Sequence, residues 1–366
     1  MSALKEIIRE IEAFAPLKLQ EDWDNSGLQI GDPEQEIHAV LLTLDITEAV
    51  IDEAIALKCN LIISHHPLLF HSMKKINYQH AHERLVFKSI QNQIAIYSAH
   101  TNLDAVRGGV NTCMAQTLKL EEIKILQPLK SYLFKLIVMI PEKYSAQVIQ
   151  SMYEAGAGHM GHYDHCGFHA EGTGTFRGLE GSSPFVGEIN KIREEAEVRF
   201  ETLVPGHALD QVIRVMIENH PHEKPSYDII TLANEYEDAG SGAIGVMPKP
   251  VSERDFLIRL KYLFNLQMIR HTPFTGKKIY KVAVCGGSGS EYTEQAIACG
   301  ADAMVSADFK YHDFMAAENR ILIADIGHYE SEVHTKEIFH KLLTKKKPNF
   351  AIHVSKINTN SINHLI

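Results

Sequence analysis

The 366-residue sequence has no long apolar run and no paired cysteines. Its hydrophobic stretches are shorter than the roughly 20 residues that a membrane-spanning helix needs, and no charged-then-apolar segment follows Met1. We therefore expect a globular, cytoplasmic protein with no membrane partner. The five cysteines are odd in number, widely spaced and without a Cys-x-x-Cys pair, which argues against a disulfide framework and against a structural zinc finger.

Basic residues are also in short supply. The 36 Lys and Arg residues are outnumbered by 46 Asp and Glu residues, which gives a formal net charge of −10. This balance disfavours attraction to phosphate backbones or anionic lipid, so we expect no nucleic-acid partner. Nucleophile motifs are missing as well, because there is no Gly-x-Ser-x-Gly elbow and no cysteine in a recognisable catalytic setting.

Metal-ligand side chains follow three strand-like apolar runs, at 61–63, 94–97 and 321–323. The side chains that follow these runs are His65, His66, His100, Asp104, His328 and Glu332. Because the carboxyl ends of parallel strands gather along one edge of an open α/β sheet, residues far apart in sequence can meet there. The pattern predicts a dinuclear metal site, and His and carboxylate ligands suit zinc, manganese, iron, cobalt or nickel.

The spacing within each pair indicates how two ions could be held. His328 and Glu332 are four residues apart at the predicted start of a helix, so both project from one face. The adjacent His65 and His66 point to opposite sides if extended, which suits ligands of two different ions. Asp104 supplies a carboxylate to one ion, and Glu332 could bridge both. Two ions about 3.5–4 Å apart lower the pKa of a bridging water, so hydrolysis is the expected chemistry.

Other polar residues at strand ends and in loops have weaker support. Asp45 and His100 could assist the ligands by hydrogen bonding or face a substrate, but helix capping and turn formation explain them about equally well. The segment 286–290 could bind phosphate through backbone N–H groups or form a plain tight turn. The residues after the strand at 303–306 could orient an anionic substrate or form a salt-bridge and capping cluster. The substrate-binding candidates are Asn25, Gly287, Ser288, Asp308, Lys310 and His312.

The order of predicted elements indicates an α/β protein in three parts. Residues 1–128 form an N-terminal α/β lobe, and 239–366 form a C-terminal α/β lobe that completes the metal site. Residues 129–238 have the β-α-β-β-α-β order of a ferredoxin-like α+β domain, which we interpret as an insertion. A Gly- and Pro-rich segment at 239–250 is expected to precede the next strand. The resulting body has two lobes in an α/β/α arrangement with mainly parallel sheets.

Histidines also crowd one segment of the insertion. His159, His162, His165 and His169 are three or four residues apart, and Cys166 lies among them. A second metal site would need this segment to be helical, whereas the glycines interspersed in it favour a loop that enters a strand. We therefore expect no metal site there.

Five motifs of the chain resemble those of one family. They are Asp-Trp-Asp-Asn-Ser-Gly at 22–27, Ile-Ser-His-His-Pro at 63–67, Ser-Ala-His-Thr-Asn-Leu-Asp at 98–104, Ser-Ala-Asp-Phe-Lys-Tyr-His at 306–312 and Gly-His-Tyr-Glu-Ser-Glu at 327–332. These motifs are similar to those of the Nif-three-like dinuclear metal-centre proteins, also called GTP cyclohydrolase I type 2 homologues. The resemblance covers essentially the whole chain.

This resemblance implies a ligand set, an assembly and a relative for the insertion. One ion would be bound by His65, Asp104 and Glu332, and the other by His66, His328 and Glu332. The family implies two divalent ions per subunit, with zinc expected in purified protein, and a toroidal homohexamer. The middle segment would be similar in fold to the signalling protein PII and the copper-tolerance protein CutA.

Two functions are consistent with these features. The leading hypothesis is a metal-dependent hydrolase of a nucleotide-like or other phosphorylated small molecule. A GTP cyclohydrolase would open the purine ring at C8 and release formate, which the predicted site could attempt. The alternative is a non-enzymatic role, in which the metal pair and the PII-like insertion form a metal-handling or ligand-sensing scaffold that regulates other proteins.

Overall fold

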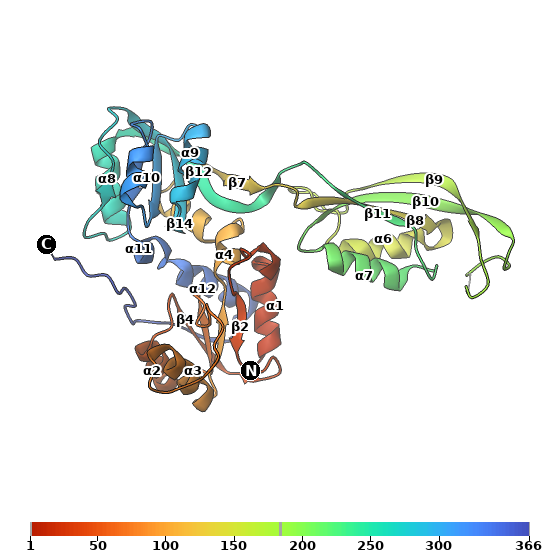
Figure 1. The fold of residues 1–366 in the computed structure, drawn as a ribbon, viewed down its shortest axis with the longest axis horizontal. Helices are drawn as coiled ribbons and strands as arrows, with labels where there is room; N and C mark the ends of the chain where they lie inside the picture. The colour runs from red at the N-terminus through yellow and green to blue at the C-terminus, as the bar shows by residue number, and fades with distance from the viewer. Residues whose placement is uncertain (1, 183–184, 366) are drawn as a thin grey trace. The chain divides into compact units, whose positions relative to one another are not determined.

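The computed structural model describes residues 2–182 and 185–365. They form two compact units, one made of Met1–Pro128 with Glu237–Ile366 and the other of Leu129–Tyr236 (Figure 1). Each unit contains its own hydrophobic core, and each is described by itself below. No helix in the described part of the chain is long and apolar enough to cross a membrane.

A five-stranded sheet forms the first half of the larger unit, with strand order β17-β4-β5-β6-β2. Its strands are β2 (Gly27–Ile30), β4 (Ala39–Thr43), β5 (Leu61–Ser64), β6 (Ala95–Ser98) and β17 (Ala351–Val354). Four of them run parallel, and β2 is antiparallel to β6. Every residue of β4, β5 and β6 is buried, as expected for parallel strands covered on both faces.

Helices cover both faces of this sheet because alternate strand residues point to opposite sides. The helices are α1 (Leu4–Phe14), α2 (Glu48–Ala56), α3 (Ala81–Gln91) and α12 (Thr335–Lys346). Leu42 and Ile63 pack in one cluster with α1 and α12, whereas Leu41 and Ile62 pack in another with α2. The Thr47 hydroxyl accepts a hydrogen bond from the Val50 amide and so caps the start of α2.

A six-stranded sheet forms the other half of the larger unit, in the order β13-β16-β15-β14-β12-β7. Its strands are β7 (Glu121–Leu129), β12 (Tyr236–Ser252), β13 (Arg270–His271), β14 (Lys278–Ser288), β15 (Ala303–Ala307) and β16 (Leu322–Asp325). The central strands β14, β15 and β16 are parallel. Helices α5 (Val110–Thr117) and α8 (Glu253–Leu263) contribute to the core on one face, and α9 (Thr293–Ala298) to the core on the other.

The expectation for the segment 239–250 was wrong. This segment lies inside β12 and pairs with β14 over Ala243–Val246, and the pairing resumes just beyond it at Val251 and Ser252. Its two prolines, Pro248 and Pro250, lie in the register shift between the two paired stretches and are exposed. Prolines within sheets are typically found at such irregularities. The sequence analysis also missed β7 and α8, which complete this sheet and its covering layer.

The insertion unit has two helices on one face of a four-stranded antiparallel sheet, in the order β11-β8-β10-β9. In chain order its elements are β8 (Leu133–Pro141), α6 (Ser145–Glu154), β9 (Gly167–Arg177), β10 (Ile192–Pro205), α7 (Leu209–Asn219) and β11 (Tyr227–Thr231). Phe200 and Val204 of β10 pack against both helices. The observed element order is therefore β-α-β-β-α-β.

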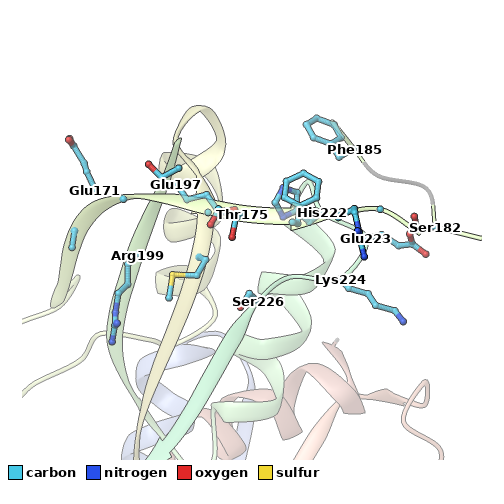
Figure 2. A pocket seen from close by; sticks show the side chains of 18 of the residues that line it. Glu171, Thr175, Ser182, Phe185, Glu197, Arg199, His222, Glu223, Lys224 and Ser226 are labelled. Atoms are coloured by element: carbon cyan, nitrogen blue, oxygen red, sulfur yellow. The ribbon is translucent and has the colours of Figure 1, made fainter. Parts of the chain in front are cut away.

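A cavity of about 720 Å³ opens in the insertion unit (Figure 2). Glu197 and Arg199 of β10 line it together with Thr175 of β9, and His222 and Lys224 contribute from the connection before β11. Its charged side chains carry both signs. The histidine-rich segment 159–169 does not line this cavity and forms a short hairpin around the Met160–Tyr163 pair.

Candidate metal centre

Three short connections at strand ends bring the predicted metal-ligand side chains together. His65 and His66 directly follow β5, and α4 (Thr101–Ala105) follows β6 and carries Asp104. Helix α11 (His328–Glu332) follows β16, and its first and last residues are two of the predicted ligands. Because β5 and β6 belong to the five-stranded sheet and β16 to the six-stranded one, the cluster draws on the two large sheets of the larger unit.

The first group of ligand-type atoms belongs to His65, Asp104 and Glu332. The Nε2 atom of His65 lies 3.6 Å from Asp104 Oδ1 and 3.7 Å from Glu332 Oε1, too far for good hydrogen bonds. His65 is fully buried, and neither its Nε2 nor Asp104 Oδ1 has a hydrogen-bond partner among the described residues. A tetrahedral ion with bonds of about 2.0–2.2 Å separates its ligand atoms by roughly 3.3–3.6 Å, so this spacing fits a metal ion.

The second group belongs to His66, His328 and Glu332. The Nε2 atoms of the two histidines lie 3.0 Å and 3.1 Å from Glu332 Oε2. Glu332 therefore turns one carboxylate oxygen toward each group. Within each group the ligand atoms lie no more than 4.8 Å apart, and the same holds for His65, His66 and His100. The cluster could hold metal, in keeping with its mixture of imidazole and carboxylate donors.

Hydrogen bonds on the outer side orient the imidazole rings. Asp45 Oδ1 lies 2.6 Å from Nδ1 of His66, and Asp308 Oδ2 lies 2.6 Å from Nδ1 of His328. The carbonyl oxygen of Ala99 lies 2.9 Å from Nδ1 of His65. A neutral imidazole that donates from Nδ1 presents its lone pair at Nε2, which is the atom that faces the cluster centre.

The same carboxylates change the pKa of two histidines. Burial alone would lower the pKa of both His66 and His328. Hydrogen bonds to Asp45 and Glu332 outweigh burial and raise the pKa of His66 to about 9. Hydrogen bonds to Asp308 and Glu332 likewise raise the pKa of His328 to about 10. Both rings therefore lie in a strongly negative environment that favours a bound cation.

The two carboxylates of the cluster have opposite pKa shifts. Burial would raise the pKa of Glu332, but the charge of His65 and hydrogen bonds from His328 and His66 hold it well below its usual range. Burial, followed by the negative charge of Glu332, raises the pKa of Asp104 well above its usual range. Two carboxylates this close repel each other, and a divalent cation between them would remove that repulsion.

Two glycines of β14 let the backbone approach Glu332 closely. A Cβ atom on Gly287 would lie 2.3 Å from Glu332 Oε1, and Gly287 has a φ of 59°. The Gly286 and Gly287 amides donate hydrogen bonds to Asn111 Oδ1 and Ser331 Oγ, respectively. These two amides are therefore not available to bind phosphate, as the prediction for segment 286–290 required. They connect α5 and α11 to the sheet instead.

His100 forms a pair with a buried carboxylate that the sequence analysis did not select. Its Nδ1 lies 2.8 Å from Asp24 Oδ1, and the Asp24 side chain has no exposed surface. Burial would raise the pKa of Asp24, but hydrogen bonds from His100, Thr101 and the Asn25 amide outweigh it and hold the pKa below its usual range. Asp24 belongs to the 22–27 motif, which was the one feature of the sequence that could have indicated its place beside the cluster.

A cavity of about 340 Å³ adjoins the cluster. His100, Asp104, His328 and Glu332 line it, as does Ser288 among the predicted substrate-binding residues. Most of its remaining lining residues were not predicted, because they do not belong to a ligand-type sequence pattern. These remaining residues include Glu21, Trp23, Thr101, Asn111, Ser241, Cys285, Glu291 and Tyr292.

Five of the six predicted substrate-binding residues do not line this cavity, Gly287 among them. The Asn25 side chain donates to the Leu69 carbonyl, on the edge of a separate surface cavity. The Lys310 amide donates to Asp313 at the start of α10 (Tyr311–Ala316), so this residue caps a helix. His312 is exposed on the same helix. Asp308 reaches the cluster, but as the partner of His328.

Comparison with known proteins identifies the family. A model of the Duf34/NIF3 (NGG1p interacting factor 3) family matches residues 2–361. The chain belongs to the Duf34/NIF3 family. Among Duf34/NIF3 relatives, one from Halalkalibacterium halodurans is 38% identical over 96% of both chains, and one from Bacillus subtilis is 37% identical over 99% of this chain and 98% of the relative. Both carry the name "GTP cyclohydrolase 1 type 2 homolog".

Solved structures of NIF3-related proteins share the fold. A Bacillus cereus protein related to NIF3 has a TM-score of 0.84 and 36% identity, with 99% of each chain covered. Staphylococcus aureus protein SA1388 has a TM-score of 0.79 and 28% identity, over 100% of this chain and 99% of that one. The mixed α/β architecture with several sheets is therefore that of the NIF3 family, and the family predicted from the five motifs is confirmed.

Proposed function

We propose that this protein is a dinuclear metal-dependent hydrolase. His65, Asp104 and Glu332 would bind one divalent ion, and His66, His328 and Glu332 the other. The observation that carries the proposal is the unpartnered His65 Nε2, which is fully buried and faces two carboxylate oxygens at 3.6 Å and 3.7 Å. A buried polar atom without a partner is costly unless a ligand satisfies it.

The chain's own residues would support this chemistry in distinct ways. Two bound ions supply a water of lowered pKa and stabilise negative charge on a substrate oxygen. Asp45 and Asp308 hold the His66 and His328 rings so that Nε2 points inward. His100, fixed through Nδ1 by Asp24, lines the cavity and could transfer a proton to the leaving group.

The names of the relatives support a nucleotide-like or other phosphorylated small molecule as the substrate. The relatives from H. halodurans and B. subtilis are named as homologues of a GTP cyclohydrolase. We carry that substrate class over as part of the proposal, with zinc, manganese, iron, cobalt or nickel as the metal.

Metal content and turnover, measured on the same gently purified preparation, test this proposal. We expect two divalent ions per chain and hydrolysis of a member of a panel of GTP and phosphoesters. Glu332→Gln should lose both ions and all turnover because one residue serves both groups. Glu294→Gln is the matched control, since Glu294 is exposed and pairs with Arg320 away from the cavity. Wild-type protein without metal would refute the proposal.

A second function has specific support from the insertion unit. Its cavity of about 720 Å³ is within the usual range for small-molecule sites and lies on a unit with its own core. A non-enzymatic metal-handling or ligand-sensing scaffold would bind an effector there. Deleting Leu129–Tyr236 separates the two functions, because an enzyme with an accessory domain should keep some turnover. A protein with two ions per chain and no turnover of any panel member would favour the scaffold.

The proposal also covers the oligomeric state, the cellular location and the fold similarity of the insertion. We expect a toroidal homohexamer in the cytoplasm, and light scattering coupled to size-exclusion chromatography tests the subunit number. The β-α-β-β-α-β order of the insertion supports a PII/CutA-like domain. A monomer at micromolar concentration would contradict the proposed assembly without affecting the metal ligands.

A further inference from the structure

The segment that follows β17 reaches the outer side of the metal cluster. Residues 355–365 form neither helix nor strand. The Ser355 amide donates a hydrogen bond to the Leu42 carbonyl, and the Lys356 amide donates one to the Glu53 carboxylate of α2. The start of the segment is therefore fixed to the five-stranded sheet and to one of its covering helices.

Thr359 of this segment holds the carboxylate that orients His66. Its hydroxyl donates to Asp45 Oδ2 over 2.6 Å, while Asp45 Oδ1 lies 2.6 Å from Nδ1 of His66. Both oxygen atoms of Asp45 are therefore engaged, one by the imidazole ring and the other by Thr359. Because the terminal torsion of an aspartate has a broad distribution, the contact with Thr359 restricts how the carboxylate can turn away from the ring.

Asn360, the next residue, contacts the helix that carries two other ligand-type residues. Its side-chain amide donates to Glu330 Oε1 over 2.9 Å. Glu330 lies within α11, whose first and last residues are His328 and Glu332. The Glu330 carboxylate occupies space left by Gly327, where a Cβ atom would lie 2.3 Å from Oε2. Asn360 therefore holds a side chain that folds back over the start of α11.

Thr359 and Asn360 are adjacent, but their partners belong to different halves of the larger unit. Asp45 follows β4 of the five-stranded sheet, whereas Glu330 lies in the helix that follows β16 of the six-stranded sheet. The segment therefore connects the two halves on the outer side of the second ligand group. The first group is held differently, because the ring of His65 is oriented by a backbone carbonyl.

We infer that Thr359 and Asn360 stabilise the second metal position, and that docking of their segment and binding of that ion strengthen each other. This inference rests on the ligand set of the proposed function, but not on hydrolysis. Both are positioning residues, since they act through Asp45 and Glu330 and do not line the cavity beside the cluster. By linkage, the factor by which docking raises the affinity for the ion equals the factor by which the ion favours docking.

Titration of the metal-free protein with Co²⁺ in the presence of a competing chelator tests the inference without requiring turnover. Thr359→Val removes the hydroxyl and keeps the branched shape, and we expect the affinity for one of the two ions to fall roughly tenfold while the other is nearly unchanged. Thr359→Ser keeps the hydroxyl and should retain the affinity. Asn360→Ala should weaken the same ion. Ile362→Ala, at an exposed position of the same segment, is the control.

A double-mutant cycle identifies the route of the effect. Since Thr359 acts through Asp45, adding Thr359→Val to Asp45→Asn should cause little further loss of affinity. Adding it to Asp308→Asn, which changes the partner of His328, should cause the full further loss. A segment that only covered the surface would produce no such difference between the two pairs.

Cleavage by trypsin after Lys356 measures the reciprocal effect. Lys356 is exposed, but its amide is bound to Glu53, so cleavage requires the segment to leave the surface. Saturation with Co²⁺ should slow this cleavage in the wild-type protein by roughly the same tenfold factor, and Thr359→Val should remove most of that protection. Intact-mass spectrometry follows the cleaved product over time.

The outcomes keep this inference and the proposed function distinguishable. Unchanged affinity for both ions in Thr359→Val would overturn the inference, as would an equal loss for both ions or an equal loss in Thr359→Ser. Full additivity with Asp45→Asn would also overturn it. If the protein shows the expected coupling and hydrolyses no panel compound, the hydrolase proposal fails and the inference stands. Wild-type protein without metal would overturn both.

Discussion

The two cavities of this protein differ in a way that volume does not reveal. The cavity of the insertion is about twice as large as the one beside the metal cluster. One member of a histidine–carboxylate pair lines each cavity: His222, 3.6 Å from Glu195, in the insertion, and Asp104, 3.6 Å from His65, beside the cluster. The facing atoms of both pairs are buried and have no hydrogen-bond partner among the described residues. Only the second pair has a third donor within reach among the described residues. A third converging ligand, and not cavity size, is what indicates a metal site.

The strongest test of this comparison removes the histidine from each pair. His65→Ala should abolish metal binding at the first position and lower the affinity of the second, because Glu332 loses the imidazole that faces its Oε1 atom. His222→Ala should leave metal content unchanged. Inductively coupled plasma mass spectrometry on both variants gives the answer, and equal metal loss in both would show that the two pairs are equivalent.

A core substitution tests whether the two units are stabilised separately. Phe200 is fully buried in the insertion, so Phe200→Ala should lower the free energy of unfolding of that unit by about 3–5 kcal/mol. Metal content should not change. Phe339→Ala, at a fully buried position in the core of the larger unit, is the matched control. Hydrogen exchange resolved by peptide measures each effect, and faster exchange in both units of either variant would contradict separate cores.

The outer carboxylates should have an intermediate effect. Asp45→Asn and Asp308→Asn each remove the charge that orients one imidazole, and we expect metal affinity to fall by roughly 10–100-fold. Competition with a chelator measures the affinity. Asp52→Asn is a suitable control because Asp52 is exposed and pairs with Lys88. Unchanged affinity in the two site variants would show that the ring orientation is fixed by packing alone.

The smallest effect concerns the close approach of β14 to Glu332. Gly287→Ala should displace the Glu332 carboxylate and weaken metal binding, in addition to a conformational cost of about 1–2 kcal/mol at positive φ. Gly276→Ala is the matched control, since Gly276 has a φ of 78° and open space around its Cβ position. Thermal unfolding with and without metal separates the two contributions. Equal metal dependence in both variants would remove the proposed role of Gly287.

The sequence was most informative where buried parallel strands end. His65, Asp104 and Glu332 were selected because ligand-type side chains follow apolar runs, and the structure brings their ligand atoms together. Their role as ligands remains a prediction. Asp24 was missed because it lies in an irregular loop, where the spacing of residues in the sequence does not predict where their side chains point.

Local composition misled the analysis in two other places. The segment 239–250 was expected not to form a strand because it is rich in Gly and Pro, but pairing with β14 outweighs those propensities. The segment 286–290 looked like a phosphate loop, whereas tertiary hydrogen bonds occupy the Gly286 and Gly287 amides. In both cases the deciding contact comes from residues distant in the sequence, which a local pattern does not contain.

The separation of His66 from Glu332 along the chain affects how the protein is made. Their side chains touch although the two positions are 266 residues apart in the sequence. At translation rates of about 5–20 residues per second, the histidines leave the ribosome on the order of ten seconds to a minute before the carboxylate that completes both groups. During that interval the nascent chain displays a histidine pair without its shared carboxylate. Loading of the proposed metal pair would therefore follow synthesis of nearly the whole polypeptide.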